Sequence, residues 1–444
     1  MTLLFSIAIG LLILGILVLV HELGHFFAAK ACKIRVLTFS IGFGAPLFKR
    51  VYGDTEYRIS TIPFGGYVRM AGDNPEEQSS GSPDEFNAKP VWQRAVVAVA
   101  GPVANLIFAF ILLWFIFIYG VGRPIYMDNL TIGGVSPNSA AQEAGLLAGD
   151  SIISIDNHAA GSWDDIETHF TRQKQQYDIT VLRNGSLYNE TLAISYGDGG
   201  FPAEPMGGLL PPVPAVIGDV HPDSPADNAS LEANDSVIAI NGETVHSFFH
   251  LSAIINDQDA NQHPFSFTIK RNNAILSKSI TAAFDSTEQN YYIGIRVAAP
   301  ETEVVRYSPL AAIPMSIGKS WEYTTMIFTV IGQLVSGQVS ANQLAGPLGI
   351  IPASGMMAMQ GLSPILNFMA LIGINLAVLN LMPLVITDGG LLFFLGLEAV
   401  RKKPLAPENQ AKINKYALLF FLALFIFVSF NDVRRLPELL RIFN

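Results

Sequence analysis

His21-Glu22-Leu23-Gly24-His25 stands directly after twenty residues, 1–20, that carry no charge. Residues four apart lie on one face of a helix, so the two imidazoles of this segment project together. Two such imidazoles suit Zn²⁺, and a Glu beside the first His can act as general base toward water on the metal. A carboxylate and two histidines at membrane depth are energetically costly, which makes them candidates for function.

Two simpler interpretations stay open. His-Glu-x-x-His also arises by chance on solvated helix faces, and an apolar N-terminal run can be a signal peptide. A signal peptide would have a basic start and a small-residue cleavage site, but the first basic residue is Lys30 and no such site ends the run. We expect a retained helix over residues 3–31, longer than one bilayer thickness.

The composition also indicates a membrane protein. Hydrophobic residues make up 50% and charged residues 14%, against about 25% charged in an ordinary soluble domain. Cys32 is the one cysteine, so an internal disulfide is excluded and the redox compartment stays undetermined. Of the net charge of −10, the excess lies in residues 120–310, with 23 acidic against 9 basic residues, and nothing indicates a nucleic-acid surface.

About four transmembrane helices are predicted: 3–31, 91–119, an interrupted stretch at 367–400, and 416–430. Lys and Arg are dense in 26–94 and 401–415 and sparse in 120–310, so the first two regions should be cytoplasmic and the third outside. Three arginines in the C-terminal tail argue mildly against this orientation.

The stretch between Glu322 and Asp388 has no charged residue but is rich in Gly, Ser, Gln and Pro. We expect a helix in the membrane interface over residues 323–335 and a loop near the membrane surface over 344–364. If 323–335 spans the membrane instead, every later segment changes side.

The middle region carries an internal repeat. The first copy contains Val135-Ser-Pro-Asn-Ser-Ala-Ala and, further on, Gly-Asp-Ser-Ile-Ile-Ser-Ile. The same pattern recurs 85 residues later, beginning at Val220. In this second copy Ser230 and Asn234 replace Gly145 and Gly149. The pattern resembles two PDZ domains, which bind chain ends or extended peptides by β-augmentation. Two spacer domains that only exclude bulky partners are the alternative.

A catalytic zinc needs a third protein ligand, and two acidic residues compete for the role. Glu56 follows His25 in a charged, cytoplasmic stretch. Asp388 follows Asn380-Leu-Met-Pro383 in the interrupted span, at a depth similar to that of His21 in the predicted topology. Pro383 and the glycines after Asp388 break the helix there, and broken backbone at that depth must line a cavity or be buried. We therefore favour Asp388, with a helix-end cap at the interface as its alternative role.

With these motifs, the chain resembles the site-2 proteases, a family of intramembrane zinc metalloproteases, and among them the bacterial members with tandem PDZ domains. The resemblance implies that His21, His25 and Asp388 hold one Zn²⁺ per chain and that Glu22 is the catalytic base. It also implies that Asn380, with Pro383 beside it, holds the substrate backbone or the developing oxyanion. Family members often have a second Pro and a His where this chain has Val385 and Leu391.

Residues 39–44 and 56–68 have the composition of β-strands. The resemblance implies a membrane-associated β-hairpin that offers a free edge to the substrate, and an ordinary cytoplasmic hairpin is the alternative. The candidate substrate contacts in the hairpin are Gly42, Phe43, Gly44, Tyr57, Ile59, Gly65 and Gly66.

The expected fold is thus a polytopic α-helical membrane protein with two inserted PDZ-like β-rich domains. Its expected parts are an N-terminal catalytic half (1–120), two PDZ-like domains (121–210 and 211–300), an interfacial helix and loop (301–364) and a C-terminal catalytic half (365–444).

The expected function is intramembrane cleavage of single-pass membrane proteins, of the anti-sigma-factor type after a first extracytoplasmic cut, or of signal-peptide remnants. The expected location is the bacterial inner membrane, with the PDZ domains periplasmic and the His-Glu-x-x-His segment near the cytoplasmic side. A PDZ adaptor without catalysis would not need Glu22, and a transporter would typically have paired broken helices, whereas one broken segment is evident.

Overall fold

The computed structural model describes residues 2–73, 81–170, 174–195, 205–256, 264–286, 290–336, 347–384, 387–403 and parts of 410–430. The chain folds into two compact units. One unit combines Met1–Val121 with Val305–Asn444, and the other is Gly122–Val304.

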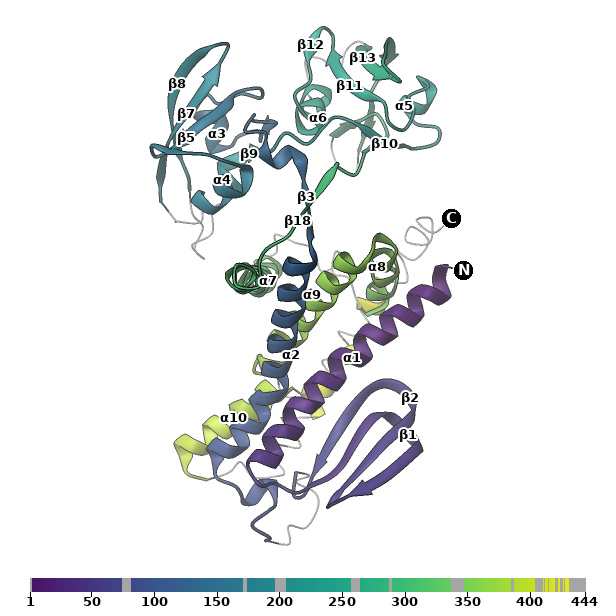
Figure 1. Cartoon of the computed structure of the whole chain (residues 1–444), viewed down its shortest axis with the longest axis vertical. Coiled ribbons are helices and arrows are strands. Elements are labelled where there is room, and N and C mark those ends of the chain that lie inside the picture. The colour runs from purple at the N-terminus through teal and green to yellow at the C-terminus, as the bar shows by residue number, and fades with distance from the viewer. Residues whose placement is uncertain are drawn as a thin grey trace. The chain divides into compact units, whose positions relative to one another are not determined.

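Three helices of the first unit are long and apolar enough to cross a membrane, counted over the described residues: α1 (Thr2–Ala31), α2 (Val91–Tyr119) and α9 (Leu362–Leu381). Their apolar composition is explained by a shared core in which Leu17, Ala109 and Ile374 are fully buried. Helices α1 and α9 run in one direction and α2 in the other (Figure 1). These helices agree with the predicted spans 3–31 and 91–119 and with the first part of 367–400. The fourth predicted span, 416–430, is described only in part, and its described residues are helical.

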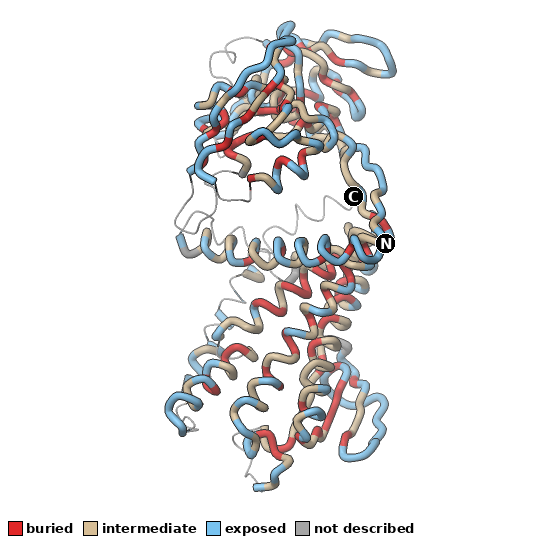
Figure 2. Tube along the Cα trace, turned by 60° about the vertical axis from the view of Figure 1, so that its left-hand side comes forward, coloured by how far each residue is buried: buried red, intermediate tan, exposed pale blue. Residues whose placement is uncertain are grey.

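Helix α7 (Ala312–Val335) contains the predicted interfacial segment and begins eleven residues before it. It is seen end-on in Figure 1, whereas α2 and α9 are seen from the side, so it lies across them. In Figure 2 exposed residues alternate with intermediate ones along this helix, and Tyr323 and Ile327 are buried. The Tyr323 hydroxyl donates a hydrogen bond to Asn367 Oδ1 of α9 at 2.9 Å, which fixes α7 to that helix.

The prediction of a loop at 344–364 was wrong, because residues Pro347–Gln360 form helix α8. Glycine and serine suggested a loop, but here they permit close helix packing against α1. A Cβ on Gly355 would lie 1.9 Å from Ser6 Oγ, and a Cβ on Gly10 of α1 would lie 3.5 Å from both Ile351 and Ser354. Tertiary packing therefore overrides the weak helix propensity of this stretch.

The segment predicted to contain strands forms β1 (Val36–Tyr52) and β2 (Thr55–Met70). Phe39 of β1 pairs with both Val68 and Tyr57, so the start of β1 is flanked by β2 on both sides. The end of β1 pairs with the start of β2 up to the turn at Tyr52 and Thr55. Residues 66–70 pair with the start of β1 along one edge, and no further strand pairing is recorded for their other edge in the described part of the chain.

The first repeat of the second unit forms a four-stranded sheet of order β6-β5-β7-β8. Trp163 and Tyr177 are fully buried in its core. Its elements are β4 (Gly134–Val135), α3 (Ala140–Glu143), β5 (Ser151–Ile155), β6 (His158–Ala159), α4 (Trp163–Phe170), β7 (Gln176–Arg183), β8 (Ser186–Ala193) and β9 (Leu209–Leu210), with β4 paired to β9.

The second repeat forms the equivalent sheet, of order β12-β11-β13-β14, around buried Phe265 and Phe267. Its elements are β10 (Ile217–Val220), α5 (Pro225–Asn228), β11 (Ser236–Ile240), β12 (Glu243–Thr244), α6 (Phe248–Asn256), β13 (Phe265–Arg271), β14 (Ala274–Ile280), β15 (Ala283–Asp285), β16 (Asn290–Tyr292) and β17 (Ile295–Val297). Strand β3 (Val121–Pro124) pairs with β18 (Thr302–Val305).

The substitutions between the repeats do not change the turns. Gly145 and Gly149 have φ of 75° and 93°, and Ser230 and Asn234 keep the same left-handed region at 57° and 71°. Asn occupies this region more readily than most residues, and Ser does so at some cost in strain. The loss of two glycines therefore gives no sign that the second repeat has lost its fold.

Candidate metal centre

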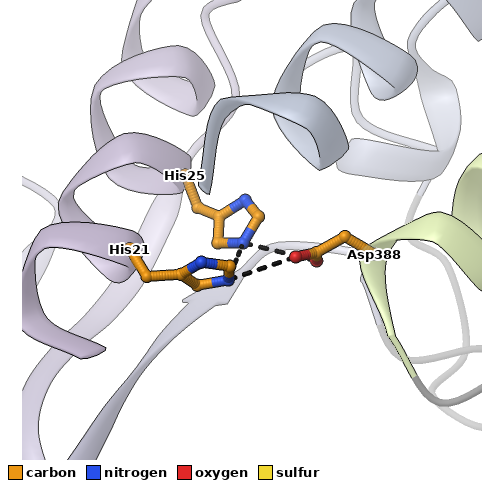
Figure 3. A group of neighbouring side chains, drawn as sticks. All are labelled: His21, His25 and Asp388. Atoms are coloured by element: carbon orange, nitrogen blue, oxygen red, sulfur yellow. Dashed lines mark hydrogen bonds and ion pairs between the residues drawn. The ribbon is translucent and has the colours of Figure 1, made fainter. Parts of the chain in front are cut away.

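Three ligand-type side chains meet between the α1 and α10 segments of the first unit (Figure 3). His21 Nε2 lies 3.1 Å from Asp388 Oδ2 and 3.1 Å from His25 Nε2, and His25 Nε2 lies 3.4 Å from Asp388 Oδ1. A tetrahedral zinc with bonds of about 2.0–2.1 Å would hold its ligand atoms about 3.3–3.4 Å apart. The spacing and chemistry of the donors therefore fit zinc.

The break in the third apolar stretch places Asp388. Helix α9 ends at Leu381, and α10 (Asp388–Arg401) begins at the ligand itself. A Cβ on Gly389 would lie 2.1 Å from the carbonyl oxygen of Met382, so only glycine fits beside the ligand.

Two further glycines bring α1 and α2 together around the site. A Cβ on Gly24 would lie 2.3 Å from the carbonyl oxygen of Ala100, so α1 and α2 are in backbone contact there. A Cβ on Gly101 would lie 2.4 Å from His25 Nε2 and 2.8 Å from His21 Nε2. Any side chain at Gly101 would fill the space between the two imidazoles, which is a second observation that fits a bound ion.

Helix α2 also orients His25. The Nδ1–H of His25 donates to the carbonyl oxygen of Val97 at 2.8 Å, which leaves Nε2 free to face Asp388. Pro102 lies inside α2 and has no N–H for the carbonyl of Ala98, so the helix ladder is interrupted at the turn that faces His25. A hydrogen bond on the far nitrogen is the usual way in which a metal-binding imidazole is held.

Glu22 lies beside the three donors in a cavity of about 310 Å³. Val68 of β2 lines the same cavity beside it. The cavity is lined by His21, Glu22, His25, Tyr67, Val68, Met70, Phe86, Val97, Ala98, Asp388 and Leu391. The carboxylate, both imidazoles and one strand of the hairpin thus share a single space.

The other predicted residues fall in several places. Glu56 forms an ion pair with Arg58 on the hairpin and is not part of the three-residue cluster. Asn380 is half-buried in the last turn of α9, and Pro383 is exposed in the break. Neither lines the cavity, and Val385 lies outside the described residues.

Among the hairpin candidates, Gly66 lies close to the cluster, since a Cβ there would be 3.6 Å from Glu22 Cγ. Gly65 packs under the ring of Phe43, and Tyr57 contacts the rings of Phe26 and Phe39. Gly42 is buried, whereas Gly44 and Ile59 are exposed, and none of these three lines the cavity.

Sequence reasoning missed Tyr67, Val68 and Met70, the hairpin residues that do line the cavity. The signal available was the strand pattern directly after Gly65-Gly66, which continues to Met70. The strand pattern could not indicate which end of the hairpin lies against α1.

The chain is similar to known proteins over nearly its whole length. Residues 9–424 match the profile of Peptidase family M50. The chain is 32% identical to Protease RseP of Yersinia pestis over 98% of this chain and 100% of that one, and 32% identical to Regulator of sigma-E protease RseP of Escherichia coli K12 over 98% and 99%. A Pasteurella multocida protein named as a zinc metalloprotease is 34% identical over 98% of this chain and 100% of that one. The chain therefore belongs to peptidase family M50 and is an intramembrane zinc metalloprotease.

Proposed function

We propose that His21, His25 and Asp388 hold one catalytic zinc ion per chain and that Glu22 is the general base. The observation that carries this proposal is the meeting of the three donor atoms, within 4.8 Å of one another, next to the Glu22 carboxylate. Zinc supplies a Lewis acid that polarises the scissile carbonyl and lets water ionise near neutral pH, with a pKa of about 7.

In the proposed reaction, Glu22 takes a proton from the attacking water and delivers it to the leaving amine. Val68 lies beside Glu22 in the cavity, and the Val97 carbonyl keeps the His25 ring in one orientation. Asn380 lies in the last turn of α9, near the start of the break, and we assign it the role of holding the substrate backbone or the oxyanion, with Pro383 shaping the break.

The substrate is proposed to bind as an extended strand along residues 66–70. A transmembrane helix hides its amides in internal hydrogen bonds, so it must unwind before the zinc site can reach one. Strand addition to a free edge then satisfies the exposed backbone groups. Support comes from the position of this edge, where Gly66 and Val68 lie against Glu22.

The proposed substrates are single-pass membrane proteins of the anti-sigma-factor type, in keeping with the sigma-E regulators among the relatives. Signal-peptide remnants are a second substrate of the same chemistry. The proposed location is the bacterial inner membrane with its lipid bilayer around α1, α2 and α9. The two repeats are then PDZ-like domains on the periplasmic side that exclude substrates with bulky ectodomains.

Cleavage of a purified single-pass test substrate by the detergent-solubilised protein, with zinc content measured on the same sample, tests this function. Cleavage should need zinc, and Glu22→Gln should retain the metal and lose about 10²–10⁴-fold in rate. Helix-breaking residues placed in the substrate segment should speed cleavage by the wild type. Wild-type rates in Glu22→Gln, or a purified protein that binds no zinc, would exclude the mechanism.

A further inference from the structure

If Nε2 of His21 binds the metal, the tautomer of its imidazole ring is fixed. Nε2 is the nitrogen that faces Asp388 and His25, at 3.1 Å from each. A neutral imidazole that offers Nε2 as a ligand carries its proton on Nδ1, and that N–H needs an acceptor. His25 has such an acceptor in the Val97 carbonyl.

Asn105 of α2 occupies the corresponding position for His21. Its side chain is fully buried, with 0% of its surface exposed, and its amide nitrogen lies 3.4 Å from His21 Nδ1. In that orientation two N–H groups would face each other when Nε2 binds a metal. At the same time Asn105 Oδ1 is buried and has no hydrogen-bond partner among the described residues.

A half-turn of the carboxamide about its last bond removes the conflict at His21. It exchanges the amide oxygen and nitrogen, which have nearly the same shape. The oxygen then accepts from the Nδ1–H of His21. Buried polar atoms are nearly always paired, so an orphaned amide oxygen next to a ring nitrogen that requires an acceptor favours this orientation.

We propose that Asn105 is a positioning residue that accepts the Nδ1–H of His21 and so fixes the tautomer in which Nε2 binds zinc. Val97 and Asn105 are eight residues apart on α2, about two helical turns, and lie on the face that contacts α1. Gly101 stands halfway between them and leaves room for both imidazoles. One face of α2 thus orients both histidine ligands. Asn105 and Val97 take part in this positioning without being zinc ligands or the catalytic base themselves. The inference rests on the proposed zinc ligation by His21.

A purely structural role for Asn105 makes the opposite prediction. If Asn105 only fills space in the α1–α2 contact, Asn105→Leu, which has the same branched shape and number of side-chain heavy atoms, should be tolerated and Asn105→Asp, a buried carboxylate, should not. If Asn105 is the acceptor, Asn105→Asp keeps the acceptor and Asn105→Leu removes it. Carboxylate, histidine and zinc in series are a common arrangement.

The experiment is a zinc titration of the full-length protein in detergent against a competing chelator, with thermal unfolding of the zinc-free form as a check on folding. Asn105→Leu should weaken zinc binding about 10- to 100-fold, and Asn105→Asp should stay within about threefold of the wild type on the same scale. The matched control is Tyr323→Phe, which removes a buried hydrogen bond between α7 and α9 and should leave zinc affinity unchanged.

The proposal is overturned if Asn105→Asp binds zinc no better than Asn105→Leu. It is also overturned if folded Asn105→Leu keeps wild-type affinity, a result that decides the matter even when Asn105→Asp does not fold. A wild-type protein that binds no zinc would instead remove the proposed function, so the two failures are distinguishable.

Discussion

Arg94, in the first turn of α2, and Glu398, in α10, form a two-bond ion pair inside the first unit. Arg94 Nη1 donates to Glu398 Oε2 at 3.1 Å and Nη2 donates to Oε1 at 2.5 Å, with 11% and 17% of the two side chains exposed. Because Asp388 begins the helix that carries Glu398, the pair connects this proposed zinc ligand to α2, which also contacts His25.

Removal of one partner of this pair should loosen α10. Arg94→Ala or Glu398→Ala leaves a largely buried charge unpaired, at a cost of about 3–5 kcal/mol, and should lower both thermal stability and zinc affinity. The exchange Arg94→Glu with Glu398→Arg should recover part of both. Lys319→Ala, which breaks an exposed pair with Glu322 in α7, should cost under about 1 kcal/mol. Equal effects at the two sites would show that the buried pair has no special role.

The identity of the third ligand can be tested by metal analysis. Asp388→Ala should lose zinc, because only two imidazoles then remain of the cluster. Glu56→Ala should retain it, since Glu56 is paired with Arg58 on the hairpin. Zinc content measured by elemental analysis on folded protein separates the two, and the reverse pattern would assign the ligand to Glu56.

Gly101→Ala should impair the metal site by overpacking. Its new Cβ would lie 2.4 Å from His25 Nε2, so the imidazoles or α2 must shift. Overpacking costs about 1–3 kcal/mol, which corresponds to about 5- to 150-fold in zinc affinity. The control is Gly332→Ala in α7, where an added Cβ meets nothing within 4 Å. Unchanged zinc affinity in Gly101→Ala would mean that the two helices are free to separate there.

The second repeat should lose stability in acid through Asp235. Burial raises the pKa of its carboxyl, but hydrogen bonds from Arg271 and from the Glu232 N–H lower it, and the pKa lies below its ordinary value. A carboxyl whose folded pKa is below the unfolded value, about 3.9, stabilises the fold above that pH. The contribution is lost as the pH falls through the folded pKa.

Asp235→Asn should therefore lower the melting temperature of the repeat at pH 7, with a difference from wild type that shrinks below about pH 4. Hydrogen exchange of β11 and β13 in the full chain reports this repeat separately. Asp219→Asn, at an exposed carboxyl, is the control and should have little effect at any pH. A difference that stays constant down to pH 2 would exclude the ion pair as its source.

The sequence predicted the segments whose structure depends on near neighbours. Long apolar runs predicted α1 and α2 to within a residue or two, and helical periodicity placed His21 and His25 on one face. The same local reasoning failed at α8, where Ser354 and Gly355 resemble loop residues but serve to pack against α1.

By itself, the sequence determined that two imidazoles share one helix face, that a carboxylate stands next to them and where the apolar helices lie. Each of these features follows from spacing along a single helix. Asp388 could be favoured over Glu56 only through a topology argument, since the two candidates lie on different segments. Only the tertiary structure decided that Val97, Gly101 and Asn105 of α2 surround the histidines and that Val68 reaches Glu22. Such contacts join residues far apart in the chain, and their geometry is set by how closely helices and strands pack, which local periodicity does not specify.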